Sequence, residues 1–403
     1  MDKQNVKLRF IVLSDLHAVD DLTGNGDSYL NKSKETSNFF NSFLDYIENL
    51  KFNPDLIICS GDIGNKAKEK NFKYGWYCLN ELKKRLKVKH LFCVPGNHDH
   101  DSRYSENDYD PKYTLQHVSP QFPCSKFNIN THFWAWHWCH IEQDVFNVIL
   151  LNSSAYHGMG SETEDYHGRV APKISEQIIN YVDSKKFKEK SINFIICHHH
   201  PCPMKVRGGD TQFMKGAENL FDDLLCKQKG AWFVIHGHRH LSGIQYAKSA
   251  VSARPVILSA GSLGKRIDNK ILGETLNQFH CVEIDIEKTK RKGEPVGIYY
   301  IHTWTLSSGW EPSKLDTIPD KGGFGATDTP IELANKFKDI LNNDKIPFLK
   351  DDELNTHIAE YTYFTPDDRQ QFIKKLKAYN IDVVIENGEI VEIGLKKKYD
   401  KYY

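Results

Sequence analysis

The sequence predicts an α/β protein in which two β-sheets are sandwiched between helices, followed by a small C-terminal α/β domain. Two patterns indicate this. Short apolar runs alternate with amphipathic segments over the first two thirds of the 403 residues, which is typical of strands in a parallel sheet covered by helices. Clusters of His, Asp and Asn begin where predicted strands end, so they are expected to share one edge of the sheets.

The first elements form a β-α-β-α-β series. Residues 7–14 contain the apolar run Phe-Ile-Val-Leu and predict a strand buried on both faces. Over residues 34–50 the apolar positions recur at helical spacing. The series is completed by a strand at 55–59, a helix at 66–86 and a strand at 90–94. We expect these three strands to lie parallel in one sheet.

The next segments supply the second sheet and close the fold. Strands are predicted at 131–138, 146–151, 192–197, 232–235 and 256–258, with helices at 172–185 and 217–227. Two alternating segments, 279–286 and 296–306, flank a turn rich in Lys, Arg and Gly. This pattern predicts an antiparallel hairpin.

Pro and Gly residues at 311–328 interrupt any regular element, so this segment is expected to be a linker. The predicted domains are therefore 1–310 and 329–403, and the sequence assigns no role to the second. In it we expect a helix at 330–342, a strand at 358–364, and a helix that Thr365 caps, with Pro at its first position. A hairpin is predicted at the end, because Asn387-Gly388 favours a tight type I′ turn.

Composition excludes several classes of protein. The chain has 53 Lys and Arg against 53 Asp and Glu, which argues against a protein that coats nucleic acid or an anionic membrane. No apolar run is long enough for a membrane span or a signal peptide. The nine cysteines include no CxxC pair and suit no closed disulfide framework. We therefore expect reduced thiols and a cytoplasmic location.

Histidine is the residue that composition leaves unexplained, with 19 in the chain. Many lie in five motifs that follow predicted strands. These motifs are Ser-Asp-Leu-His at 14–17, Ser-Gly-Asp-Ile at 60–63, Pro-Gly-Asn-His-Asp at 95–99, His-His-His-Pro at 198–201 and Gly-His-Arg-His at 237–240. Segments far apart in the sequence are thus expected to converge in space.

A set of carboxylates, imidazoles and one amide suits Mn, Fe or Zn better than Mg or Ca, which prefer oxygen ligands alone. The motifs offer more than six candidate ligands, too many for one ion. Two ions that share a bridging carboxylate would use them. Gly61, Gly96 and Gly237 stand beside the candidate ligands and would let the backbone turn sharply there.

The five motifs, in this order, resemble those of the calcineurin-like binuclear metallophosphoesterases. The resemblance covers about residues 7–305, and it implies the two-sheet sandwich core of that family. The segment from the His-His-His-Pro motif through residues 216–219 is also similar to the bacterial cyclic-nucleotide phosphodiesterase branch. The implied activity is hydrolysis of phosphoric esters, either diesters or monoesters.

The resemblance implies a role for each motif residue. Asp62 would bridge the two metals. His199 would be the ligand of the fourth motif, because the family's ligand there is the His two positions before Pro. The first metal would be held by Asp15, His17 and His240, and the second by Asn97, His199 and His238.

The same resemblance implies the mechanism. A hydroxide bridging the metals would attack phosphorus in line while the metals neutralise the phosphoryl oxygens. His98 would stabilise the transition state or protonate the leaving oxygen, and Asp99 would orient His98. Arg103 is a candidate phosphate contact.

Other polar residues have two interpretations each. His198 and His200 are expected to pack or to form hydrogen bonds beside a ligand. The segment 155–169, which carries His157, His167 and Arg169, either helps to bind substrate or is a solvated connection.

Three functions compete. The first is hydrolysis of a small phosphoester or nucleotide. The second is a DNA nuclease of the Mre11/SbcD type that works with a partner ATPase, against which no basic stripe is evident along the core. The third is a metal-free interaction scaffold, which would require missing ligands. The C-terminal domain could cover the active site, bind a partner or build an oligomer.

Overall fold

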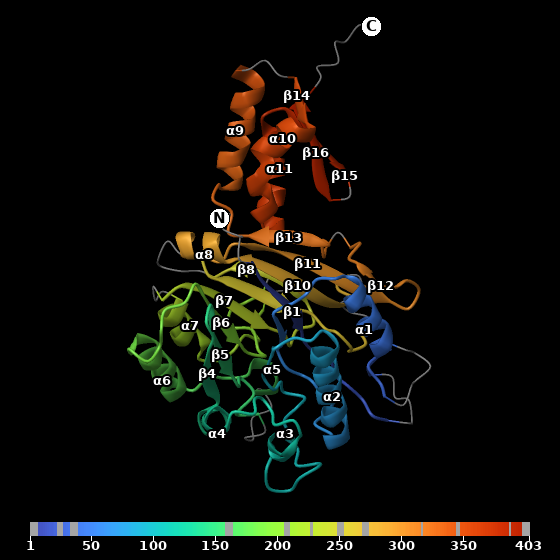
Figure 1. Cartoon of the computed structure of the whole chain (residues 1–403), viewed down its shortest axis with the longest axis vertical. Helices are drawn as coiled ribbons and strands as arrows, with labels where there is room; N and C mark the ends of the chain where they lie inside the picture. Colours follow the sequence, from blue (N-terminus) through green and yellow to red (C-terminus); the bar gives the residue numbers. More distant parts are fainter. Residues whose placement is uncertain are drawn as a thin grey trace.

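The computed structural model describes residues 7–21, 27–32, 39–157, 164–204, 210–225, 229–247, 254–267, 274–315, 317–343, 347–386 and 388–396. A large body holds two β-sheets with helices outside them, and a smaller unit stands on one end of this body (Figure 1). The predicted two-sheet α/β fold with a small C-terminal α/β unit is confirmed.

The first sheet has seven strands in the order β12-β11-β10-β1-β2-β3, with β13 also paired to β11. Its parallel strands are β1 (Lys7–Leu13), β2 (Leu56–Cys59) and β3 (His90–Cys93). The predicted hairpin is present as β10 (Asn277–Asp285) and β11 (Gly297–Thr305), which pair antiparallel across the short helix α8 (Ile286–Lys292).

The second sheet has six strands in the order β4-β5-β6-β7-β9-β8. The strands are β4 (Trp138–Glu142), β5 (Phe146–Leu151), β6 (Ile192–Ile196), β7 (Ala231–His236), β8 (Ser242–Tyr246) and β9 (Val256–Ala260). Strands β5, β6, β7 and β9 are parallel. Their carboxyl ends therefore lie along one edge.

Helices cover the outer faces of both sheets (Figure 1). Outside the first sheet are α1 (Phe39–Asn49) and α2 (Glu69–Arg85), and outside the second are α6 (Pro172–Asp183) and α7 (Ala217–Leu225). The remaining helices of this part of the body are α3 (Tyr113–His117), α4 (Phe127–Trp136) and α5 (Glu164–His167); α3 lies at the end of the body away from the C-terminal unit (Figure 1).

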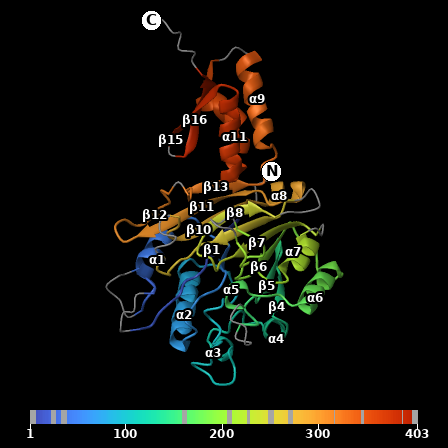
Figure 2. The same cartoon turned by 180° about the vertical axis from the view of Figure 1, so that it is seen from behind.

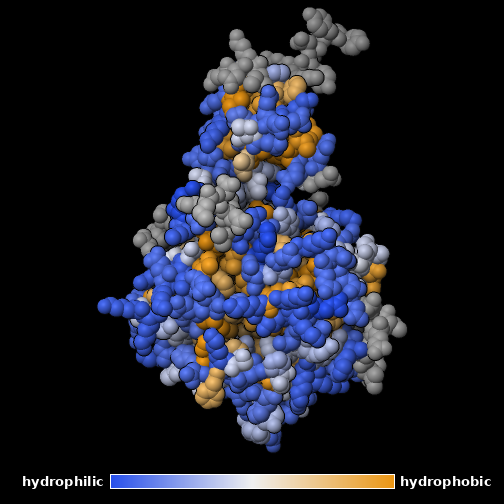
Figure 3. All heavy atoms as spheres, in the orientation of Figure 1, coloured by the Kyte–Doolittle hydropathy of each residue, from blue (hydrophilic) through white to orange (hydrophobic). Residues whose placement is uncertain are grey.

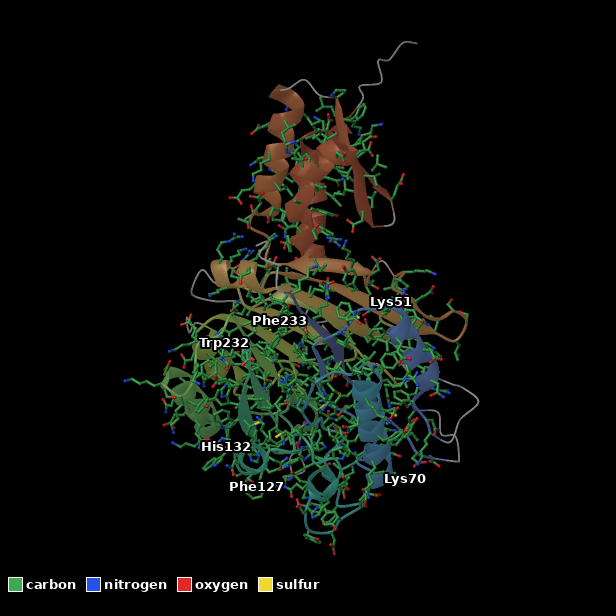
Figure 4. The ribbon with its side chains drawn as sticks, in the orientation of Figure 1. Lys51, Lys70, Phe127, His132, Trp232 and Phe233 are labelled. Atoms are coloured by element: carbon green, nitrogen blue, oxygen red, sulfur yellow. The ribbon has the colours of Figure 1, made fainter. Side chains whose placement is uncertain are left out.

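Alternation along the strands builds the core. Phe233 of β7 packs between the two sheets with Phe10 and Phe194. Its neighbour Trp232 belongs to the apolar cluster under α6 and α7. Figure 4 labels both residues on β7. Strand β7 is buried at every position, and only its last residue, His236, is polar, as expected of a strand covered on both faces.

The C-terminal unit has its own apolar core around Phe337, Phe364 and Phe372. Its helices are α9 (Pro330–Asn343), α10 (Asp351–Ile358), the 3₁₀ helix η2 (Ala359–Tyr363) and α11 (Pro366–Ala378). They pack on one three-stranded sheet of β14 (Phe348–Lys350), β16 (Glu389–Leu395) and β15 (Ile381–Glu386). Figure 2 shows this unit from behind.

Two predicted features of this unit are present. Thr365 caps α11 in a capping box with Asp368, as its sequence predicts. Strands β15 and β16 form the predicted antiparallel hairpin. Asn387, which was expected in its turn, lies outside the described residues.

Two predicted strands are wrong. Residues 131–136 belong to helix α4, and only Trp138 begins strand β4. The aromatic run here is too short to distinguish a period of two from a helical period, and its buried residues Asn130 and Phe133 are three positions apart. Residues 358–364 end α10 and form η2, where Tyr361 and Phe364 are buried at 3₁₀ spacing.

The segment expected to be an irregular linker contains two strands, β12 (Gly309–Pro312) and β13 (Lys321–Phe324), both paired with β11. The glycines of β13 allow close packing, Gly322 against β11 of the same sheet and Gly323 against the C-terminal unit. A Cβ on Gly322 would lie 2.3 Å from Tyr299 Oη, and one on Gly323 would lie 2.1 Å from the Thr362 carbonyl of η2. Glycine here marks close packing and not a flexible connection.

Candidate metal centre

The polar motifs converge at the carboxyl ends of β1, β2, β3, β6 and β7, as the sequence predicts. Four groups of His and Asp place their ligand atoms within 4.8 Å of one another. The groups are Asp15–His17–His240, His17–Asp62–His98, Asp15–Asp62–His198 and His198–His199–His238. Residues from both sheets thus form one continuous cluster.

The first cluster surrounds His240. Its Nε2 lies 3.2 Å from Asp15 Oδ1 and 3.2 Å from His17 Nε2. His17 Nε2 is also 3.5 Å from Asp62 Oδ2. Donor atoms at these separations can share one transition-metal ion with bonds of about 2.0–2.2 Å.

The second cluster surrounds Asn97. Its Oδ1 lies 3.0 Å from His198 Nε2 and 3.1 Å from His238 Nδ1. His198 Nε2 is also 3.4 Å from Asp62 Oδ2. The same oxygen of Asp62 therefore contacts both clusters, as a bridging carboxylate would.

His198, which was expected from the sequence only to pack or to form hydrogen bonds, lies among the candidate ligand atoms together with His199. Its Nδ1 donates to the Ser60 carbonyl at 2.8 Å, which leaves Nε2 facing Asn97 and Asp62. A metal-ligating imidazole is held in the same way, through its other nitrogen. His199, the residue inferred from the motif, contacts Ser153 Oγ through Nδ1 at 2.9 Å, and its Nε2 is buried beside His238. The spacing to Pro201 favoured His199, whereas the composition of three adjacent histidines does not separate them.

Hydrogen bonds fix the remaining ligand atoms. His238 Nε2 donates to the Tyr166 carbonyl at 3.0 Å, so Nδ1 faces Asn97. Asp15 Oδ2 accepts from Ser14 Oγ at 2.6 Å and from the His238 amide at 3.1 Å. Asp15 Oδ1 is buried and accepts no hydrogen bond from the described residues. A buried carboxylate oxygen whose closest contact is an imidazole nitrogen, that of His240, fits a cation.

Glycines let the backbone pass close to the side chains of the two clusters. A Cβ on Gly96 would lie 2.1 Å from Asp62 Oδ1, and one on Gly237 would lie 1.9 Å from Ser14 Oγ. Gly61 has a φ of +105°. Five candidate ligands are themselves strained: φ lies between 44° and 75° at Asp15, His17, Asp62, His238 and His240. Such strain of order 1–2 kcal/mol per residue is typical of functional sites.

The charges agree with a cation site. Burial alone would raise the pKa of Asp15, but nearby His240 outweighs it and brings that pKa to about 2. Burial likewise opposes ionisation of Asp62, and His198 and His98 hold its pKa well below the usual value. Both carboxylates are therefore ionised at neutral pH.

His98 and Asp99 have different surroundings. The His98 ring lies 4.7 Å from that of His17, and its amide donates to Asp62 Oδ1 at 2.8 Å. The Asp99 carboxylate accepts from the amides of Ile63, Gly64 and Gly96 at 2.7–3.1 Å. Among the described contacts, Asp99 thus holds the two loops that carry Asp62 and Asn97 and does not bond the His98 imidazole.

A cavity of about 320 Å³ opens beside both clusters. His98, Arg103 and His157 line it, together with Lys66 and Tyr166, which the sequence did not indicate. His167 and Arg169 are not among the described lining residues. The Arg169 amide donates a hydrogen bond to the Ser153 carbonyl at 2.8 Å. Residues 158–163 of that segment lie outside the described part of the chain.

Two clusters of His, Asp and Asn that share one carboxylate, set at strand ends of a two-sheet sandwich, define a binuclear metallohydrolase. A model of the calcineurin-like phosphoesterase family matches residues 8–256. The chain belongs to this family, and it is a metal-dependent phosphoric ester hydrolase.

One relative and two solved structures illustrate the similarity. The chain is 24% identical over 306 residues to a probable glycerophosphodiester phosphodiesterase, GpdQ, of Arcobacter nitrofigilis, covering 74% of this chain and 89% of the relative. A dimetal phosphatase from Danio rerio aligns with a TM-score of 0.43 and 12% identity, over 69% of this chain and 94% of its own. Purple acid phosphatase PPD1 from yellow lupin (Lupinus luteus) seeds aligns with a TM-score of 0.42 and 13% sequence identity. The alignment covers 79% of this chain and 53% of the phosphatase.

Proposed function

We propose that the chain hydrolyses a small phosphodiester at the two clusters joined by Asp62. The observation that carries this proposal is the position of Asp62 Oδ2, 3.5 Å from His17 Nε2 and 3.4 Å from His198 Nε2. One oxygen in contact with two sets of imidazoles is suited to join two cations.

The donor chemistry favours Mn, Fe or Zn in both positions, because imidazoles are numerous and thiolates are not involved. Asp15, His17, Asp62 and His240 would hold one ion. Asp62, Asn97, His198 and His238 would hold the other, with His198 in the position that the motif alone assigned to His199. When bound, such a pair supplies Lewis acidity and lowers the pKa of water to about 7 in the best-known zinc case.

The chain's own residues would complete the chemistry. His98 lines the cavity, and burial lowers the pKa of its imidazole. The neutral ring keeps one N–H and can donate a hydrogen bond to the leaving oxygen, and it would have to take up a proton before it could act as a general acid. Arg103 lies at the rim of the same cavity and can contact a phosphoryl oxygen. Asp99 would act indirectly, because its contacts position the loops that carry the ligands.

Size and position favour a small substrate. All described residues that line the cavity lie between positions 62 and 240 in the sequence, so none belongs to the C-terminal unit. This argues against a nuclease in which that unit helps to grip DNA at the active site. The relative named as a glycerophosphodiester phosphodiesterase supports a diester substrate. A metal-free scaffold is disfavoured because every ligand position of both clusters is filled.

The test combines metal analysis with a substrate panel. Purified protein is expected to retain about two transition-metal ions per chain and to cleave bis-p-nitrophenyl phosphate after Mn²⁺ addition. Cyclic nucleotides, glycerophosphodiesters and linear or circular DNA complete the panel. Absence of both metal and activity would overturn the proposal, and cleavage of DNA alone would replace it with the nuclease.

We also propose a cytoplasmic location. The eight described cysteines are all free thiols, six of them buried, and a reducing compartment keeps such thiols intact. No helix among the described residues is long and apolar enough to cross a membrane. Fractionation of the native cells, with detection of the chain in the cytosolic fraction, tests the location.

A further inference from the structure

A second cavity, of about 280 Å³, lies where the body meets the C-terminal unit. Lys288, Arg291 and Lys292 of α8 form one side, and Thr327, Glu360 and Tyr363 form the other. The space-filling view shows hydrophilic residues on either side of the junction, with some hydrophobic ones between them (Figure 3). None of these residues lines the metal-centre cavity.

The carboxylates present do not balance the cations gathered here. Glu294 is shared, because its Oε2 lies 3.2 Å from both Lys292 Nζ and Arg254 Nε. Thr327 donates its amide to Glu360 at 2.6 Å. Among the described lining residues, the three cations Lys288, Arg291 and Lys292 face one carboxylate, Glu360, and Lys292 also pairs with Glu294 behind it.

Two of these cations have structural roles. Lys292 Nζ donates to the carbonyls of Gly325 and Ala326 at 3.0 and 2.6 Å, and Arg254 Nη2 donates to Ala326 at 2.9 Å. Burial lowers the pKa of Lys292, and Arg254 adds to this against the opposing effect of Glu294. The two cations therefore crowd around one turn, and an anion nearby would relieve their repulsion.

The other two cations can serve a ligand. Lys288 Nζ donates to Tyr363 Oη at 2.8 Å and lies 4.4 Å from the centre of that ring. The Tyr363 hydroxyl accepts this bond and can donate its own hydrogen outward. Arg291 is exposed and has no hydrogen-bond or ion-pair partner among the described residues.

We propose that this junction cleft binds a phosphate-type dianion, either inorganic phosphate or the phosphate group of a small phosphorylated ligand. Arg291, Lys288 and Tyr363 supply donors from both units. A bound dianion neutralises the excess charge and joins α8 of the body to η2 of the C-terminal unit. It therefore strengthens the contact between the two units, at a place separate from the metal centre.

Hydrogen exchange of the full-length, metal-loaded protein tests the proposal. Inorganic phosphate is expected to slow amide exchange in α8 and in residues 359–363. Arg291→Gln should weaken this phosphate-dependent protection about tenfold or more, since charge-assisted hydrogen bonds to anions are among the strongest in proteins. Arg291 has no described partner, so this variant leaves folding intact. Lys290→Gln removes a charge from the same helix outside the cavity lining and is the matched control.

Two further arms separate the sources of the anion. Phenylphosphonate, whose P–C bond a phosphoesterase does not hydrolyse, stands in for a phosphorylated organic ligand. Protection by both probes supports the organic ligand, and protection by phosphate alone supports the free anion. The proposal is overturned by no protection in wild type, by equal loss in Lys290→Gln, or by protection that only an oligonucleotide produces. Slower exchange in peptides near residues 97–105 reports phosphate bound at the metal centre. The two sites are therefore read out separately, and absence of binding at one does not affect the test of the other.

Discussion

At the scale of single residues, the arrangement of nitrogens decides what each histidine can do. His198 and His238 each use one ring nitrogen for a backbone carbonyl, Ser60 and Tyr166 respectively, and present the other to Asn97. Imidazoles held in this way need not turn to bind a cation. Burial opposes protonation of His198, but Asp62 raises its pKa to about 9, so a cation would bind there with release of a proton. The positive φ angles at the candidate ligands likewise hold their side chains in position before a cation binds.

The pair His198 and His199 gives a direct prediction. His198→Gln is expected to reduce bound metal from about two ions per chain to about one, because Nε2 contacts both Asn97 and Asp62. His199→Gln, the matched control on the next residue, should keep both ions. Metal content of the purified variants decides the matter. Loss of an ion in His199→Gln alone would restore the assignment made from the motif.

His98 should affect turnover but not metal content. His98→Ala is expected to lower kcat by about 10²–10⁴-fold, the usual contribution of a general acid. Its side chain lines the cavity, whereas its backbone amide, which the substitution keeps, holds Asp62. Steady-state kinetics and metal analysis on the same preparation test this. Unchanged turnover would show that another group protonates the leaving oxygen.

The sequence predicts the metal centre well at this scale but not completely. Motifs at strand ends locate Asp15, Asp62 and Asn97, since the parallel strands that carry them end at one edge. The choice between His198 and His199 depends on which ring turns toward the carbonyl of Ser60, a contact 138 positions away in the chain. The role of Asp99 depends similarly on amides of another loop.

At the scale of elements, strand β13 connects the two units. Gly323 donates its amide to the Phe364 carbonyl at 3.0 Å, and Lys321 pairs with Glu389 at 2.8 Å. The sequence presented this segment as a linker because its glycines and prolines match no regular pattern. The glycines are instead required by the close approach of η2, which local sequence does not reveal.

Gly323 is therefore expected to control the docking of the C-terminal unit. Gly323→Ala places a methyl group 2.1 Å from the Thr362 carbonyl, a backbone atom that cannot move aside easily. The unit should detach or become less stable, and proteolysis near residues 325–330 should accelerate. Gly243→Ala is the control, since its Cβ would meet no atom within 4 Å. Equal protease resistance of both variants would contradict the close-packing argument.

The cap of α11 offers a second test at this scale. Thr365 Oγ1 accepts a hydrogen bond from the Asp368 amide at 3.2 Å, and the Asp368 carboxylate accepts one from the Thr365 amide at 3.2 Å. Thr365→Ala is expected to lower the free energy of unfolding of the C-terminal unit by about 1 kcal/mol. Denaturant unfolding of the full chain measures it. Phosphoesterase activity should be unchanged, because no residue of this unit lines the metal-centre cavity among the described residues.

At the scale of the whole molecule, the C-terminal unit and the metal-centre cavity lie at different ends of the body. The C-terminal unit contacts β13 and β11 at one end of the body, while α3 and α5 mark the region of the cavity away from it (Figures 1 and 2). The unit therefore does not cover the active site. The junction cleft gives it a separate role, in which a phosphate-type anion links the two parts.

The histidine content of the chain also has a consequence for the whole molecule. Several imidazoles are buried and held neutral outside the metal clusters. Burial lowers the pKa of His280 to about 3 and that of His302 to about 4. These rings bond Ser242 Oγ at 3.0 Å and Tyr46 Oη at 2.9 Å in the two central strands β10 and β11.

Acid should therefore destabilise the metal-loaded protein at mild pH. In the unfolded chain these histidines have a pKa of about 6.5. Below that pH the unfolded state takes up protons that the folded state refuses, so the stability present above pH 6.5 falls by up to about 1.4 kcal/mol per pH unit for each histidine. Between pH 6.5 and 4, His280→Gln should reduce the slope of the unfolding free energy against pH by up to about 1.4 kcal/mol per pH unit, the contribution of one histidine. Urea unfolding at pH 7.5, 6.0 and 5.0 measures the slope, and an equal slope in wild type and variant would show that His280 takes up its proton without unfolding.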